Sequence, residues 1–95
     1  MDFEWDENKN KLNIEKHGID FNEAKNVFDD SKRKIAPDLR KDYGEERWLT
    51  IGKVLDTIVV VVYTIRSEVS RIISARYAKK AERDKYYIEK NDSDK

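Results

Sequence analysis

The 95-residue sequence contains no cysteine and only one histidine. Disulfide bonds and cysteine-ligated zinc sites are therefore excluded, and so are the zinc and ribonuclease sites that need two histidines. With three glycines and one proline, no stretch has the composition of a linker. The length predicts a single domain over residues 1–90, followed by a short polar tail over residues 91–95.

Long hydrophobic segments are absent as well. The longest apolar run, residues 58–63, is far too short to cross a membrane as a helix. No apolar stretch follows the first five residues, so we expect no signal peptide and a cytoplasmic protein. The glycine-rich phosphate loop and the G-x-S-x-G and H-E-x-x-H motifs are also missing. We expect no cofactor, no metal site and no contact with a membrane.

Charged side chains make up 42% of the sequence, yet its 20 basic and 20 acidic residues cancel. Their placement is uneven: residues 1–30 contain four basic and nine acidic side chains, whereas residues 66–90 contain eight basic and four acidic ones. Such a gradient can give a domain one basic face that attracts a polyanion. The alternative is a charged surface that only keeps the protein in solution.

A first helix is predicted over residues 6–16. Asp6 is a suitable N-cap, because its side chain can accept hydrogen bonds from the first free backbone amides. Gly18 is a suitable stop, because it adopts a positive φ at little cost. The apolar face of this helix is poor and consists of Leu12 and Ile14.

A second helix is predicted over residues 20–29. Asp20 and Glu23 have the spacing of a capping pair at its start. An apolar face follows from residues at i, i+3, i+6 and i+7, namely Phe21, Ala24, Val27 and Phe28.

The middle of the chain changes to strand periodicity. Short strands are predicted over residues 33–36 and 47–52, and a longer one, rich in β-branched residues, over 57–64. Because residues 58–62 are apolar at both parities, the longer strand should lie inside the sheet with both faces covered. A strand over residues 71–77 completes the set.

A final helix is predicted from Ala78 to Ile88, in a segment rich in good helix formers. The short loops between the strands imply a four-stranded antiparallel meander. Two N-terminal helices, this meander and a C-terminal helix make an α+β domain.

The residues most informative about chemistry are arginines: Arg47, Arg66, Arg71, Arg76 and Arg83. Ordering an arginine at a sheet is costly unless an anion meets it. Several arginines from adjacent strands can converge on a phosphate and stabilise the charge of its transition state. The alternative is that each arginine pairs with a nearby acid, for example Arg47 with Glu46.

Aromatic and imidazole groups allow two interpretations each. Trp48, Tyr63 and Tyr77 can stack on unpaired bases, whereas Trp48 and Tyr63 can equally belong to the core. His17 can interact with the C-terminal dipole of the first helix, or it can contact phosphate or act as a general base.

Five sequence blocks, in order, resemble the BrnT family of type II toxins. They are F-E-W-D-E-N-K, N-I-E-K-H-G-I-D-F-N-E-A, G-E-E-R-W-L-T-I-G, V-V-V-Y-T-I-R and R-I-I-S-A-R-Y-A-K-K-A-E-R-D-K-Y, which together run from Phe3 to Tyr86. The resemblance implies a RelE-like fold and a metal-independent endoribonuclease that arrests growth by cutting RNA. It also implies a BrnA-type ribbon-helix-helix antitoxin, and contact with operator DNA only through the toxin–antitoxin complex.

The resemblance also implies site residues. Arg66 and Arg76 are expected to bind the phosphate and Arg47 to position the substrate, while Lys9 and His17 are candidates for proton transfer. Further contributions to RNA binding are expected from Arg71, Arg83, Lys79, Lys80 and Tyr77. The alternative function is a non-catalytic co-repressor that acts only within a DNA-bound antitoxin complex, and a scaffold whose arginines make only salt bridges is a third.

Overall fold

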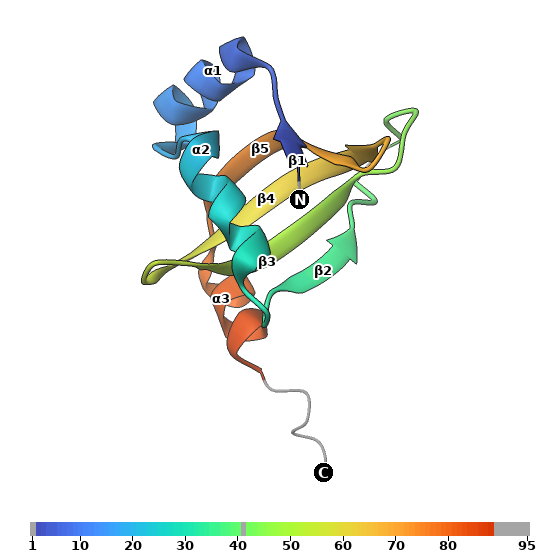
Figure 1. The fold of residues 1–95 in the computed structure, drawn as a ribbon. Coiled ribbons are helices and arrows are strands. Elements are labelled where there is room, and N and C mark those ends of the chain that lie inside the picture. Colours follow the sequence, from blue (N-terminus) through green and yellow to red (C-terminus); the bar gives the residue numbers. More distant parts are fainter. Residues whose placement is uncertain (1, 41, 89–95) are drawn as a thin grey trace.

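A computed structural model describes residues 2–40 and 42–88. Its elements in chain order are β1 (Asp2–Glu4), α1 (Glu7–His17), α2 (Phe21–Ala24), the 3-10 helix η1 (Lys25–Asp29), β2 (Lys34–Pro37), β3 (Trp48–Val54), β4 (Thr57–Arg66), β5 (Val69–Tyr77) and α3 (Lys80–Tyr87). Figure 1 shows α2 and η1 crossing in front of the sheet, α1 beyond its β5 edge and α3 at the end of the described chain. The domain is therefore α+β, as predicted.

The sheet has five strands in the order β1-β5-β4-β3-β2 (Figure 1). The four expected strands form the antiparallel meander β2-β3-β4-β5, and β4 lies in the interior between β3 and β5. The prediction of a purely antiparallel, four-stranded sheet is wrong, because β1 adds a parallel pairing to β5. Three residues carry no strand periodicity, so only their pairing with a distant segment makes them a strand.

Local signals predicted the helix boundaries well. The Asp6 side chain accepts hydrogen bonds from the backbone amides of Asn8 and Lys9, and Gly18 ends α1 with φ 74°. Asp20 caps α2 by accepting from the amide of Asn22. The predicted second helix is α-helical only over its first turn and continues as the 3-10 helix η1.

One face of the sheet, here called the α2 face, holds the larger core. Phe21 and Val27 are fully buried there against Val59 and Val61 of β4. Tyr63 is buried in this core, and Trp48 packs against it half-buried, which confirms the core interpretation for both aromatics. Apolar residues of the other parity, Ile51, Ile58 and Val60, form a smaller cluster with Ala78 and Tyr86 on the opposite face.

The sequence had suggested that α1 packs through its apolar residues, but it does not. Leu12 is 63% exposed and Ile14 41% exposed, whereas Asn10 and Asn13 are buried. The Asn13 side chain donates to the carbonyl of Ala75 at 2.8 Å and accepts from its amide at 3.1 Å. An asparagine amide thus takes the role of a neighbouring strand at the edge of β5, next to the segment that pairs with β1.

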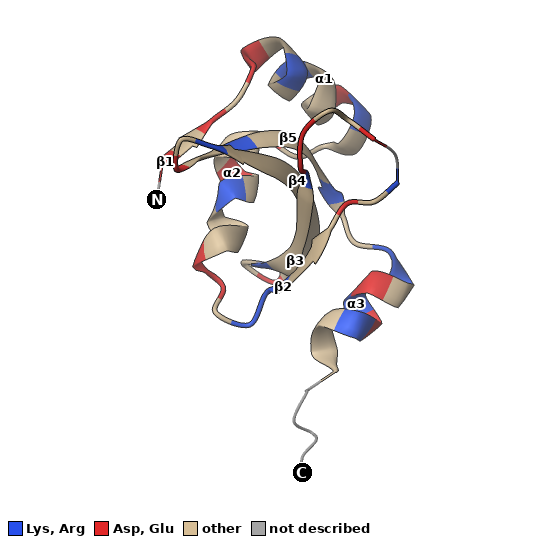
Figure 2. Ribbon diagram, turned by 90° about the vertical axis from the view of Figure 1, so that its right-hand side faces the viewer, with Lys and Arg blue, Asp and Glu red and all other residues tan. Residues whose placement is uncertain are grey.

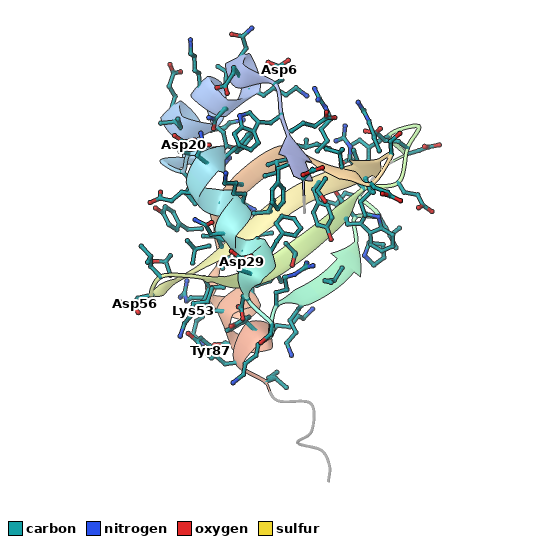
Figure 3. The ribbon with its side chains drawn as sticks, viewed as in Figure 1. Asp6, Asp20, Asp29, Lys53, Asp56 and Tyr87 are labelled. Atoms are coloured by element: carbon teal, nitrogen blue, oxygen red, sulfur yellow. The ribbon has the colours of Figure 1, made fainter. Side chains whose placement is uncertain are left out.

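Helix α3 is held at one end of the opposite face. The Tyr86 hydroxyl donates to Asp30 Oδ2 at 2.6 Å, and the same oxygen accepts from the backbone amide of Lys53 at 2.8 Å. The Lys53 Nζ lies 5.9 Å from the ring centre of Tyr87, and Figure 3 shows the two labelled residues near each other beside α3. These contacts join α3 to β3 and to the segment after η1.

Within residues 2–40 and 42–88, no helix is long and apolar enough to span a membrane. The polar tail predicted for residues 91–95 lies outside the described residues.

Candidate functional site

Strand register places four arginines on the face of the sheet that carries α3. Arg76 pairs with Val60, a member of the cluster beneath α3, and Arg71 pairs with Thr64 further along that side of β4. Arg66 lies two residues after Thr64 on β4 and therefore points to the same face. Arg47 directly precedes β3, opposite this end of β4. We call this surface, defined by Arg47, Arg66, Arg71 and Arg76, the arginine face.

The arginine face is only partly covered. Figure 2 views the sheet edge-on, with α2 on one side and α3 on the other. Residues 38–40 and 42–47, of the loop that connects β2 and β3, also lie on the α3 side (Figure 2). Helix α3 covers the end at Val60 and Arg76, which leaves the end at Arg66 to the loop.

Each of the four arginines makes an ion pair with a glutamate. Arg76 pairs with Glu82 at 2.8 Å, Arg71 with Glu4 at 3.2 Å, and Arg66 with Glu45 at 2.8 Å. Arg47 lies 3.6 Å from the same Glu45, not from Glu46 as the sequence had suggested. The arginines thus reach one face, and each is also accompanied by an acid.

The Arg66–Glu45–Arg47 cluster has one carboxylate between two guanidinium groups. Glu45 Oε1 accepts from Arg66 Nη2, while Oε2 faces Arg47 Nε at a distance too long for a hydrogen bond. The Arg47 guanidinium stacks over the Tyr43 ring at 3.9 Å. Arg66, and secondarily Arg47, hold the pKa of Glu45 below its ordinary value.

The Arg47 Nε atom is buried and has no hydrogen-bond partner within the described part of the chain. A buried unsatisfied donor costs free energy unless an acceptor reaches it. This donor lies beside the one carboxylate that Arg66 and Arg47 share.

Arg76 and Glu82 form a different kind of pair. Two parallel hydrogen bonds of 2.8 Å join them, and Glu82 also accepts from the backbone amide of Lys79 at the start of α3. The hydrogen bonds from Arg76 lower the pKa of Glu82 from 4.5 to about 2, and Glu82 in turn raises the pKa of Arg76. This pair ties β5 to the N-terminus of α3.

The two arginines expected to bind the phosphate lie far apart. Arg76 is level with Val60, and Arg66 lies six residues further along β4. At about 3.3 Å per residue this separates them by about 20 Å. A single phosphate group cannot contact both side chains at that distance, whereas a strand of several nucleotides can.

Lys9 and His17 of α1 lie beside the middle of β5. With Lys16, they line a hollow of about 240 Å³ beside Ile73 and Ser74. Ser74 pairs with Val62, whose parity is that of the arginine face. The two proton-transfer candidates therefore border the arginine face from its β5 edge.

The other predicted RNA-binding residues are distributed around α3 and the far side. Lys79 caps α3, and Lys80 pairs with Asp84 in a largely exposed (i, i+4) contact. Arg83 donates to the carbonyl of Ala78 at 2.9 Å. Tyr77 pairs with Val59 and lies on the α2 face, away from the arginines.

Sequence reasoning missed the acids that accompany the arginines. Glu45 stands two residues before Arg47, a spacing that could have suggested their contact. Glu4 meets Arg71 only because β1 pairs with β5, and Glu82 meets Arg76 only because the chain turns into α3. Within the described ranges, no group of three or more His, Asp or Glu side chains could hold a metal ion.

The structure therefore defines a small α+β domain that carries four arginines on one face of its sheet, a side-chain type that binds phosphate as well as carboxylate groups. Residues 5–82 of the chain match a family described as the ribonuclease toxin, BrnT, of the type II toxin-antitoxin system, and the protein belongs to that family. The resemblance noted from the sequence blocks is thereby confirmed. None of the curated proteins compared with the chain matches it.

Proposed function

We propose that this toxin is a metal-independent endoribonuclease that binds RNA along the arginine face and arrests growth by cutting it. The observation that carries the proposal is the placement of Arg47, Arg66, Arg71 and Arg76 on one side of the sheet. Ribonuclease activity agrees with the description of the family. The reaction needs no metal when the 2′-hydroxyl of the RNA is the nucleophile and the protein supplies proton transfer and charge stabilisation.

Arg66 and Arg47 stabilise the phosphate at the reacting bond. They lie beside the same carboxylate, that of Glu45, so a single phosphate can reach both, and α3 does not cover this end of the sheet. Arg76, about 20 Å away, contacts a different phosphate of the same strand. Lys9 and His17 are the candidates for proton transfer; the hollow that they line meets β5 at Ser74, which is level with Val62, about 13 Å along β4 from Arg66. Arg71, Arg83, Lys79 and Lys80 extend the basic track for the RNA backbone.

The proposal includes a RelE-like fold, a cytoplasmic site of action and a BrnA-type ribbon-helix-helix antitoxin as partner. An antitoxin segment that covers the arginine face would block RNA binding. Operator DNA would then be contacted only through the antitoxin complex. Co-expression with the antitoxin and capture of the tagged toxin tests this, and capture of the toxin alone as a stable, harmless monomer contradicts it.

A second function, a non-catalytic co-repressor, is favoured by one observation. Each arginine of the face already has a glutamate partner, as expected if these residues only maintain the fold. Exposed ion pairs contribute only about 0–1 kcal/mol, however, so an RNA phosphate can displace such a partner. The two functions differ in whether the purified protein cleaves RNA.

The decisive experiment compares the wild type with Arg66→Ala on purified total RNA, with and without a metal chelator. The wild type should cleave equally well in both conditions. Loss of one charge-stabilising donor should slow cleavage by about 10²–10³-fold. The melting temperature should change little, because the Arg66 side chain is 52% exposed. Full activity of Arg66→Ala, or no cleavage by the wild type, would contradict the proposal.

A further inference from the structure

The Arg66–Glu45–Arg47 cluster resembles a phosphate site that the protein has filled with its own carboxylate. A carboxylate and a phosphodiester each present two oxygens and one negative charge to guanidinium groups. Glu45 Oε1 lies 2.8 Å from Arg66, and Oε2 lies 3.6 Å from Arg47. One glutamate thus spans two arginines but satisfies only one of them.

The Nε atom of Arg47, which has no hydrogen-bond acceptor in the described part of the chain, marks where a better ligand would bind. This atom is buried, and the stacked Tyr43 ring fixes the plane of the Arg47 guanidinium. A phosphodiester is not tethered to this backbone as Glu45 is, so it can direct one of its two non-bridging oxygens to each arginine. The ligand would therefore gain the hydrogen bond to Arg47 that Glu45 does not make.

The backbone around Glu45 allows the carboxylate to leave. Gly44, directly before it, has φ 76°, a conformation that glycine enters and leaves readily. The Arg66–Glu45 pair borders a hollow of about 430 Å³ that also reaches Trp48 and Thr64. A departing Glu45 side chain has open space beside it, and so does an arriving nucleotide.

The alternative role for Glu45, a general base for the 2′-hydroxyl, fits less well. The hydrogen bond from Arg66 lowers the pKa of Glu45 below its ordinary value. A carboxylate with a lowered pKa is a poorer proton acceptor near neutral pH. Glu45 is better suited to occupying an anion site than to removing a proton.

We propose that Arg47 and Arg66 form a single subsite for an RNA phosphate, which Glu45 occupies in the free protein and vacates when RNA binds. The proposal rests on the proposed function and adds to it a competitor built into the chain. Glu45 then lies among the residues that contact RNA and weakens RNA binding, because its carboxylate competes with the phosphate for the two arginines.

The test measures binding separately from cleavage. The probe is a fluorescent RNA oligonucleotide with 2′-O-methyl groups throughout, which has no free 2′-hydroxyl nucleophile and is not cut. Glu45→Gln should bind it about 3–10-fold more tightly than the wild type at low salt, since an acid next to the phosphate is removed. Glu46→Gln is the matched control: it removes the same charge from an exposed side chain that borders the same hollow, whereas the ion pairs of Arg47 and Arg66 in the described part of the chain are with Glu45. It should therefore gain less affinity than Glu45→Gln.

A double variant assigns the effect to the subsite. In an Arg66→Ala background, Glu45→Gln should increase the affinity for the RNA oligonucleotide much less, because residues 45 and 66 then no longer interact. Equal or weaker binding by Glu45→Gln, or an equal gain from Glu46→Gln, would overturn the proposal. These outcomes leave RNA cleavage by the wild type untouched, so a failure of the subsite proposal is distinguishable from a failure of the ribonuclease proposal.

Discussion

The α2 face and the arginine face are built by the same strands, yet their chemistry differs. On the α2 face, Phe21, Val27 and Val61 have no exposed surface, and aromatic rings such as Phe28 and Tyr63 pack edge-to-face. On the arginine face, charged side chains lie in pairs, and the Arg66 side chain is 52% exposed. The strands alternate between these two environments at every residue.

The difference separates stability from binding. Burial of large apolar side chains stabilises the domain by about 1.5–3 kcal/mol for each residue, and no ligand can replace those contacts. Partly exposed ion pairs contribute about 0–1 kcal/mol, so their partners can be exchanged at small cost. Substitutions on the α2 face should therefore unfold the protein, whereas substitutions at the Arg66 end should alter RNA binding and leave the fold intact.

The largest expected effect is on the α2 face. Phe21→Ala should lower the free energy of unfolding by about 3–5 kcal/mol, because Phe21 is fully buried and its removal leaves a cavity. Urea denaturation followed by circular dichroism measures the loss. Leu39→Ala, at a site 82% exposed, is the control and should change stability by less than about 0.5 kcal/mol. Similar midpoints for the two variants would contradict the assignment of the core.

The next effect tests the α3 end of the arginine face, where the ion pair is less exposed. The pKa of Glu82 is lowered from 4.5 to about 2 in the folded protein. Its stabilising contribution, about 2 kcal/mol once solvent screening of this partly exposed pair is allowed for, is therefore present above pH 4.5 and lost as the pH falls toward 2. Glu82→Gln should be less stable than the wild type at pH 7, and the difference should disappear near pH 2.

Denaturant unfolding of both proteins at a series of pH values isolates Glu82 from the other carboxylates with lowered pKa, because these are common to both. Arg76→Ala should reproduce the loss at pH 7, since it breaks the same two hydrogen bonds. A difference between wild type and Glu82→Gln that is constant with pH would show that the pair does not act through its charge.

A third effect is expected at the β5 edge of the sheet, where Asn13 attaches α1. Asn13→Ala removes the side chain that bonds both backbone groups of Ala75, and should cost about 1–3 kcal/mol because these buried groups lose their partner. Asn8→Ala, on the exposed first turn of α1, is the matched control. Hydrogen exchange at the Ala75 amide should become faster in Asn13→Ala only, and unchanged protection there would contradict the edge role.

The smallest effect is expected at the exposed start of α3. Lys79→Ala and Lys80→Ala should leave the melting temperature almost unchanged, because both side chains lie in solvent. Each should weaken RNA binding slightly and reduce the slope of log K against log salt, by about 0.7 for each phosphate that the protein no longer neutralises. Titration of the uncleavable oligonucleotide at several salt concentrations measures this. A weakening as large as that of Arg66→Ala would place α3 inside the active site.

Much of the fold could be predicted because its signals are local. Asp6, Asp20 and Gly18 each act on backbone groups within four residues, so the helix ends follow from the sequence around them. The apolar residues of β4 at both parities required cover on both faces of the sheet; α2 and η1 cover one face, and α3 covers part of the other. Such features depend on periodicity and capping, which a sequence displays directly.

The candidate site could be predicted only as a set of residue types. Arg47, Arg66 and Arg76 were identified, but their spacing along the sheet follows from the register of β4 against β5. The bulge between Val62 and Tyr63 shifts that register by one residue, and nothing in the local pattern indicates it. The distinction between the more exposed pair at Arg66 and the less exposed pair at Arg76, which has two hydrogen bonds, therefore required the structure.

The sequence alone determined the helix caps, the buried central strand, the family and the identity of the arginines. Tertiary structure decided that β1 joins the sheet, that Asn13 rather than Leu12 holds α1, and that a glutamate accompanies each arginine of the face. The physical reason is range. Capping and amphipathic patterns act between neighbours in the chain, whereas an ion pair or an edge hydrogen bond joins groups that only the folded backbone brings within about 3 Å.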